Sequence, residues 1–252
     1  MTAGAWFALL TTLLFHKGSA QFLNANCGSV SSNQTVSPYP WLAIIELPTK
    51  KCSGTLVNRN YVITSATCVF DQKIATVRLG VFDRSKLGNS GYNYSEEVFQ
   101  MQSAYVPEFY NQTTRKNDIA LLKLSNPVVY KDHIRPICIL LDNSIVKIYD
   151  AIFAIRWGLR KKKNMFPGPK LSSPKSFNSR MCREVSQICA GYKTNCVEPG
   201  SPLTKSVVYS HYIRLVLFGI QSYGTRNGCV YTEITSYIDW IVRVVLEVDI
   251  VW

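Results

Sequence analysis

Residues 52–57 read Cys-Ser-Gly-Thr-Leu-Val, and residues 61–68 read Tyr-Val-Ile-Thr-Ser-Ala-Thr-Cys. Residues 61–65 form a short apolar run rich in β-branched and aromatic side chains, which is typical of a β-strand. The stretches 86–94 and 166–179, rich in Gly, Pro, Asn or Ser, are interpreted as surface loops. Further strand-like runs lie at residues 41–46, 76–82, 118–124, 151–157, 207–219 and 230–234. Short strands at this spacing predict an antiparallel sandwich or barrel.

The C-terminal part of the chain differs from the rest because its apolar residues recur at helical spacing. This pattern begins after Ser236 and predicts an amphipathic helix. Asp239 near its start and Arg243 further along carry the charges that a helix dipole favours at those ends. The apolar residues of the pattern are Tyr237, Ile238, Ile241, Val242 and Val245.

A chain of 252 residues is compatible with one all-β domain. Its N-terminus combines an apolar run, residues 3–15, with the small residues Gly18, Ser19 and Ala20. This combination predicts a signal peptide over residues 1–20. A membrane anchor is the alternative, but the apolar run is shorter than the ~20 residues that cross a bilayer. We therefore expect a secreted, extracellular protein with one mature domain, residues 21–252, and no membrane span.

Secretion determines how the eight cysteines are interpreted, because an oxidising compartment favours disulfides over metal binding. None of them forms a C-x-x-C pair, so we expect structural disulfides, no metal site and no cofactor. The sequons at Asn33, Asn93 and Asn111 predict a glycoprotein. The cysteines are Cys27, Cys52, Cys68, Cys138, Cys182, Cys189, Cys196 and Cys229.

The chain is strongly basic, with a formal charge of +12 that becomes +11 when Lys17 leaves with the signal peptide. Residues 160–163 read Arg-Lys-Lys-Lys. This run has two interpretations: a site for an anionic partner such as a sulfated glycan or a cell surface, or a solvated loop with no partner. Nucleic acid is not expected as a partner, since no nucleic-acid-reading motif is present.

Four ordered motifs resemble those of the trypsin and chymotrypsin family, called S1, and particularly its secreted insect members. The resemblance covers nearly all of the mature chain, and the combination of motifs is more specific than any one of them. The first consists of residues 52–57 and 61–68, and the second of residues 117–124 with Ile-Arg-Pro-Ile-Cys at 134–138. The third runs from residues 187–191 to Gly-Ser-Pro-Leu at 200–203, and the fourth comprises residues 219–224, 230–232 and 237–241.

The resemblance implies an all-β fold of two antiparallel six-stranded barrels, with a C-terminal α-helix and a site in the cleft between the barrels. It also implies four disulfides. These are Cys27 with Cys138, Cys52 with Cys68, Cys182 with Cys189, and Cys196 with Cys229.

The catalytic triad that the family uses is incomplete in this sequence. Thr67 occupies the place of the histidine, and Asp118 retains the place of the aspartate. Pro199 occupies the place of the nucleophilic serine, because residues 196–203 read Cys-Val-Glu-Pro-Gly-Ser-Pro-Leu and lack one residue of the family motif. A serine hydroxyl needs a base that takes its proton, and a threonine does not act as one near neutral pH. We interpret Asp118 as a buried acid that the fold needs.

Two other parts of the protease mechanism are altered. Residues 28–40 contain no Arg or Lys and no Ile-Val-Gly-Gly, so they offer no activation site of the family type. Thr194 takes the position that sets basic specificity, while Ser222, Tyr223 and Gly224 retain the segment that pairs with a substrate strand. We expect these four residues to be the remnant of a substrate pocket.

The leading hypothesis is a secreted pseudoprotease that acts as a binding or regulatory protein on an extracellular protein or an anionic glycan. The alternative is an active serine-type endopeptidase with relocated residues, for example Ser201 paired with His211. His211 is expected to lie in a hairpin, His133 in the connection formed by residues 132–136, and His16 in the predicted signal peptide. A third hypothesis, a decayed gene, is opposed by the survival of the cysteines and the strand pattern. The sequence does not assign an oligomeric state.

Overall fold

The structure is a computed structural model that describes residues 22–29, 39–81, 96–142, 147–157, 169–173, 182, 184–190, 196, 198–225 and 228–247. The predicted signal peptide, the basic run 160–163 and the predicted loop 86–94 lie outside the described residues. Thr194, Asn33 and Asn93 lie outside them as well.

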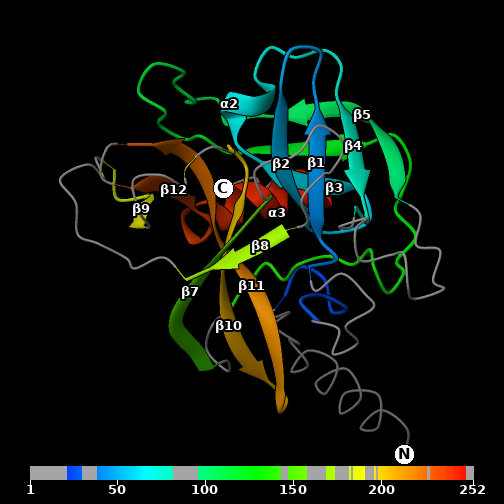
Figure 1. The fold of residues 1–252 in the computed structure, drawn as a ribbon, viewed down its shortest axis with the longest axis vertical. Coiled ribbons are helices and arrows are strands. Elements are labelled where there is room, and N and C mark those ends of the chain that lie inside the picture. Colours follow the sequence, from blue (N-terminus) through cyan, green and yellow to red (C-terminus); the bar gives the residue numbers. More distant parts are fainter. Residues whose placement is uncertain are drawn as a thin grey trace, which may run out of the picture.

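The first half of the described chain forms a closed antiparallel barrel in the order β1-β2-β3-β6-β5-β4 (Figure 1). Strand β4 closes the barrel by pairing with β1, and the short helix α2, Ala66–Val69, follows β3. The barrel strands are β1 Leu42–Glu46, β2 Lys51–Leu56, β3 Tyr61–Thr64, β4 Thr76–Leu79, β5 Glu97–Tyr105 and β6 Ala120–Leu124.

The second half forms a six-stranded antiparallel sheet in the order β8-β7-β10-β11-β12-β9. Within the described residues its outer strands β8 and β9 do not pair with each other, so this half is an open half-barrel. The strands are β7 Lys147–Trp157, β8 Pro169–Ser172, β9 Gln187–Ala190, β10 Pro202–Tyr209, β11 Tyr212–Gly224 and β12 Cys229–Glu233.

The last described elements are a 3-10 turn, η2 Ile234–Tyr237, and the helix α3 Ile238–Leu246. Ile241 of α3 is fully buried in the core cluster that also contains Tyr61 of β3. The hydroxyl of Tyr61 donates a hydrogen bond to the carbonyl oxygen of Val244 at 3.2 Å, and so anchors the helix to the barrel. The predicted C-terminal helix is confirmed.

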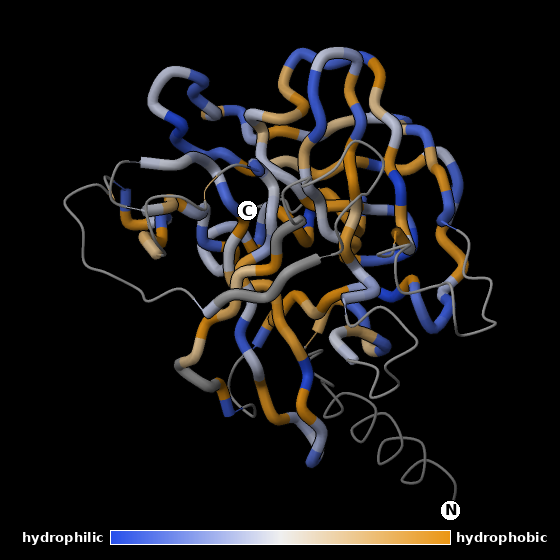
Figure 2. Tube along the Cα trace, in the orientation of Figure 1, coloured by the Kyte–Doolittle hydropathy of each residue, from blue (hydrophilic) through white to orange (hydrophobic). Residues whose placement is uncertain are grey.

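Burial explains why these residues form strands. Ile45, Leu56, Ile63 and Leu121 come from four barrel strands and are all fully buried in one hydrophobic cluster. Figure 2 shows hydrophobic residues recurring along the strands and hydrophilic residues at many of the loops that join them. The predicted fold class, mostly β with a trypsin-like arrangement and a terminal helix, is confirmed.

The hairpin expected at His211 is confirmed: the run 207–219 contains parts of β10 and β11, because Ser210 and His211 turn the chain with φ angles of 48° and 68°. Positive φ at both central residues gives the tight hairpin turn that joins twisted strands, although glycine or asparagine usually marks it. The predicted loop 166–179 contains β8, whose proline is compatible with an edge strand.

Four disulfides connect the cysteines in the pairs that the resemblance implies: Cys27–Cys138, Cys52–Cys68, Cys182–Cys189 and Cys196–Cys229. The first spans 111 positions of the chain and the third only 7.

We expect loss of the Cys27–Cys138 bond to destabilise the protein more than loss of the Cys182–Cys189 bond. Removing a cross-link restores conformational entropy to the unfolded chain, and the gain grows with the length of the closed loop. The double variant C27A/C138A should lose about 4–5 kcal/mol of unfolding free energy and C182A/C189A about 2–3 kcal/mol. Urea denaturation measures both values. Equal losses would show that loop length does not set their relative contributions.

An ionic network on the barrel surface joins three strands at Glu46. The carboxylate of Glu46 accepts hydrogen bonds from Lys51 on β2 and from Arg78 Nε on β4, the latter at 2.7 Å. Arg78 Nη1 also donates to Glu96 at 2.7 Å. Lys51 and Arg78 stabilise the charged carboxylate and so lower the pKa of Glu46.

Because the pKa of Glu46 is lower in the folded than in the unfolded protein, its contribution to stability is present above the unfolded pKa of about 4.3. The contribution disappears as the pH falls through the folded pKa. We expect Glu46→Gln to reduce stability at pH 7 and to flatten the loss of stability below pH 4.3. Urea unfolding from pH 7 to 3 measures both effects. If the variant lost as much unfolding free energy below about pH 4.3 as the unmodified protein does, the lowered pKa of Glu46 would not contribute to acid unfolding.

Candidate functional site

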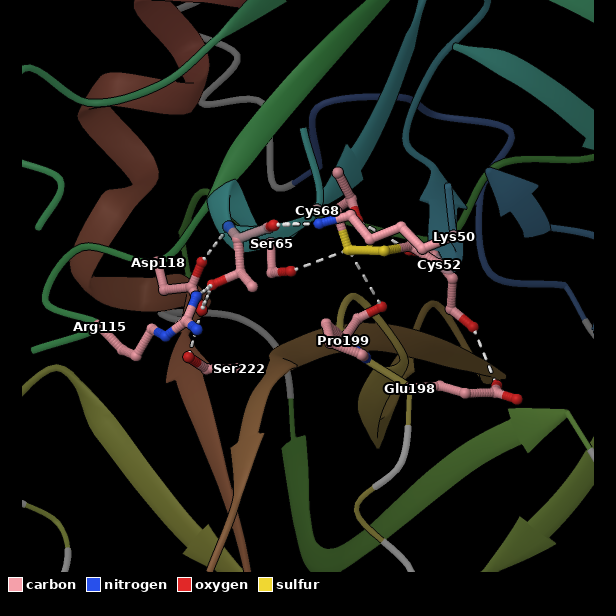
Figure 3. The surroundings of a disulfide bond; sticks show 12 residues. Lys50, Cys52, Ser65, Cys68, Arg115, Asp118, Glu198, Pro199 and Ser222 are labelled. Carbon is pink, nitrogen blue, oxygen red and sulfur yellow. Dashed lines mark hydrogen bonds between the residues drawn. A yellow bond between two sulfur atoms is a disulfide. The ribbon is translucent and has the colours of Figure 1, made fainter. Parts of the chain in front are cut away.

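The candidate site lies where the barrel meets the second sheet, around the carboxylate of Asp118. This residue precedes β6 and is fully buried. Thr67 of α2 donates to it twice, from its backbone N–H to Oδ1 at 2.7 Å and from its hydroxyl to Oδ2 at 2.9 Å. The hydroxyl of Ser222 on β11 also donates to Oδ2 (Figure 3). The structure therefore brings together three predicted site residues from both halves of the fold.

The backbone of Asp118 is bound to the second sheet as well. Its carbonyl oxygen accepts a hydrogen bond from the hydroxyl of Thr232 on β12 at 2.8 Å. A buried carboxylate is stable only when hydrogen bonds or charges replace the water it has lost, and here three donors do so. This arrangement agrees with the interpretation of Asp118 as a buried acid that the fold needs.

Two basic residues contact Thr67, and sequence reasoning missed both. Arg115 Nη1 donates to the hydroxyl oxygen of Thr67, and Lys50 Nζ donates to its carbonyl oxygen at 2.8 Å. The hydroxyl of Tyr110 lies 3.3 Å from the same threonine oxygen. Burial lowers the pKa of Lys50, and the positive charge of Arg115 lowers it further. The available signal was the Arg115-Lys116-Asn117 sequence immediately before Asp118.

A tight turn presents Arg115 to the site. The Asn111 side-chain oxygen accepts the N–H groups of Thr113 and Thr114 at 3.0 and 2.9 Å. The backbone N–H of Arg115 donates to the Asn111 carbonyl at 2.8 Å. Arg115 and Asn117 adopt left-handed φ angles of 59° and 56°, a conformation that costs roughly 1–2 kcal/mol for an L-residue. Asn111, a predicted glycosylation site, is exposed on this turn.

The segment 198–201 is fixed between the two halves of the fold. The N–H of Ser53 on β2 donates to the carbonyl of Pro199 at 3.0 Å, and the N–H of Gly200 donates to the carbonyl of Gln221 on β11 at 2.8 Å. The Ser53 hydroxyl donates to Glu198 at 3.3 Å. Gly200 has a φ of 86°, and a Cβ atom there would overlap the carbonyl oxygen of Ser53. Pro199 thus lies beside the Cys52–Cys68 disulfide (Figure 3).

Ser201 and His211 do not come together. Ser201 precedes β10, and its side chain is buried with no hydrogen-bond partner among the described residues. His211 lies in the exposed turn after that strand. The eight residues of β10 separate the two by about 26 Å at 3.3 Å per residue. The predicted alternative pairing of these two residues is wrong.

The remaining predicted residues are placed as follows. His133 is buried in the turn between Lys131 and Ile134. Tyr223 and Gly224 end β11 and pair with Val230 and Cys229 of β12. The pairing of β11 with β10 ends at Ile220, and the backbone of Gln221 is still bonded to Gly200 and Ser201, so residues 222–224 extend past the neighbouring segment on that side.

Neither a metal cluster nor a membrane helix is found within the ranges described above. No three residues among their His, Cys, Asp and Glu are grouped as metal ligands. None of their helices is both long and apolar enough to cross a bilayer.

Comparison with known proteins agrees with the fold. The structure of the Drosophila Grass clip serine protease of the Toll pathway superimposes with a TM-score of 0.69 at 20% sequence identity, covering 95% of this chain and 78% of the other. CLIP domain-containing serine protease B9 of Anopheles gambiae is 28% identical over 83% of this chain and 61% of its own length. Phenoloxidase-activating enzyme 1 of Spodoptera litura is 30% identical over 81% of this chain and 63% of its own length.

The chain therefore spans less than two thirds of the length of these two relatives. A model of the family described as Trypsin matches residues 28–241. That range includes β1 to β12, every cysteine of the four disulfides except Cys27, and the first residues of α3. The protein belongs to the trypsin family.

Proposed function

We propose that this chain is a non-catalytic member of the trypsin family that acts outside the cell as a binding or regulatory protein. The observation that carries the proposal is the double hydrogen bond from Thr67 to Asp118. In a working triad the aspartate orients an imidazole that takes the proton of the nucleophile. Here Asp118 instead holds a hydroxyl group, which does not accept a proton near neutral pH.

The segment that should provide the nucleophile supports the same proposal. Pro199 has no hydroxyl group, and its carbonyl oxygen is occupied by the N–H of Ser53. The nearest serine, Ser201, is only 3% exposed. A nucleophile and its base must approach to about 3 Å. Among the described residues, the hydroxyl of Ser201 has no hydrogen-bond partner, histidine included. Loss of the nucleophile or base lowers turnover by about a million-fold.

The extracellular location is inferred from the cysteines. Four disulfides that leave no free thiol among the described residues are typical of proteins folded in an oxidising compartment. A signal peptide over residues 1–20 and glycosylation at Asn33, Asn93 and Asn111 belong to the same proposal. The partner is an extracellular protein or an anionic glycan.

The end of β11 supports peptide binding as the mode of action. Residues 222–224 lie past the pairing of β11 with β10 and past the backbone bonds of Gln221 with Gly200 and Ser201. Exposed strand edges of this kind accept extended peptides through backbone hydrogen bonds. Binding of this kind needs no nucleophile. A regulator that retains a peptide-binding edge can compete with active proteases for the peptide segments that they cleave. It can also guide those proteases to the same segments.

We expect the secreted, purified protein to show no peptidase activity on a mixed peptide library, with or without pretreatment by trypsin. It should also remain unlabelled by a fluorophosphonate probe, because no serine is activated by a base. Trypsin itself, treated in parallel, controls for both assays.

Two outcomes would overturn this proposal. One is covalent labelling of any serine by the fluorophosphonate. The other is turnover that disappears in the Ser201→Ala variant while the protein remains folded and fully oxidised, which would mean that a catalytic site has been rebuilt.

We expect Asp118→Ala to reduce the unfolding free energy by about 3 kcal/mol or more, since it leaves buried donors of Thr67 and Ser222 without an acceptor. Asp132→Ala is the matched control, because Asp132 is exposed and pairs only with Arg135 three residues later. Its effect should be below about 0.5 kcal/mol. Thermal and urea denaturation measure both. A fully stable Asp118→Ala variant would show that the acid is not kept for the fold.

A further inference from the structure

Two cations approach Thr67 from different sides, and neither has an acidic partner in the described parts of the chain. Arg115 donates to the hydroxyl oxygen of Thr67, and Lys50 donates to its carbonyl oxygen at 2.8 Å. None of the ion pairs formed by the described residues includes either one. A guanidinium group has five N–H donors and an ammonium group three, so most of their donors remain free for a ligand.

Asp118 does not balance this charge. It carries one negative charge, is fully buried, and already accepts hydrogen bonds from Thr67 and Ser222. Lys50 and Arg115 carry two positive charges and Asp118 one negative charge, so the partly exposed surface of the site has an excess of positive charge. The lowered pKa of Lys50, caused first by burial and then by the charge of Arg115, agrees with this excess.

The neighbouring lysines show that the arrangement is not a general result of the basic composition. Lys116 follows Arg115 in the same turn, but its ammonium group lies 3.5 Å from the carboxylate of Glu184. Lys51 follows Lys50, and it pairs with Glu46. At both places one basic residue is in an ion pair, while its neighbour contacts Thr67 and forms no ion pair with any described residue.

Aromatic residues lie close to Thr67 and to the turn that carries Arg115. The ring of Tyr110 packs against Phe70 at a centroid distance of 5.2 Å, while its hydroxyl lies 3.3 Å from Thr67 Oγ1. Phe70 is 44% exposed, and Phe109, whose carbonyl accepts a hydrogen bond from Asn117, is 75% exposed. Apolar groups at the rim reduce the local screening of charge and strengthen ionic contacts.

We propose that Lys50 and Arg115 form a binding site for a carboxylate, namely an acidic side chain of a partner protein. A guanidinium matches the planar carboxylate with parallel hydrogen bonds, and the ammonium adds a point charge. The two cations meet at one residue, which suits a single carboxylate better than a sulfated chain that needs a row of cations. The inference rests on the proposed function, because a binding protein can fill this cleft with a ligand that it never cleaves.

The test uses two pools of N-acetylated, C-amidated hexapeptides with an uncharged fluorophore. One pool has glutamate at the third position and the other has glutamine there, with uncharged residues at random elsewhere. Fluorescence anisotropy in 50 mM salt measures binding to the full secreted chain. We expect the glutamate pool to bind about tenfold or more tightly than the glutamine pool, as for hydrogen bonds between charged groups.

The variant K50Q/R115Q should lose this preference. Its matched control, K51Q/K116Q, removes the same total charge from the adjacent residues and should keep the preference. Arg115→Lys should retain part of it, since the charge remains while the paired geometry is lost. Thermal unfolding of each variant confirms that it is folded.

Three results would overturn the proposal. The two peptide pools could bind equally, or the two double variants could lose the preference for glutamate equally. The third is that K50Q/R115Q weakens the binding of a heparin hexasaccharide while neither peptide pool binds the protein. Fluorophosphonate labelling of the same preparation tests the proposed function separately. A labelled serine with an intact preference for glutamate would overturn the pseudoprotease assignment alone.

Discussion

The buried carboxylate of Asp118 joins the two halves of this fold. It receives hydrogen bonds from Thr67 after the barrel strand β3 and from Ser222 on β11, while its own carbonyl binds Thr232 on β12. Because a buried charge without partners is strongly destabilising, these contacts fix how the barrel and the sheet meet. An acid at this position therefore has a structural role that does not depend on catalysis.

A second set of contacts holds the same junction at a different point. Segment 198–201 binds β2 through Ser53 and β11 through Gln221. Further from the site, Cys138 exchanges backbone hydrogen bonds with Leu215 and Leu217 and is joined to Cys27 by a disulfide. These connections make segment 198–201 part of the scaffold and help to hold the two halves in a trypsin-like arrangement.

Much of this architecture could be predicted from the sequence, because residues 61–65 and 118–124 carry apolar patterns long enough to identify strands. The terminal helix was predictable for the same reason, and the cysteine pairs followed from the family resemblance. Strand β2 was missed as a separate element because Ser53 and Gly54 weaken its apolar pattern. The contacts of Lys50 and Arg115 with Thr67 depend on three distant segments, which no local pattern records.

The backbone conformation and the packing of Gly200 require a glycine at this position. Its left-handed backbone and its contact with Ser53 exclude every side chain, for reasons of packing between β2 and β11. Selection for folding alone would preserve a glycine here through long periods of drift. The glycine at position 200 therefore reports on the packing of the scaffold, and it carries no information about whether this protein cleaves peptides.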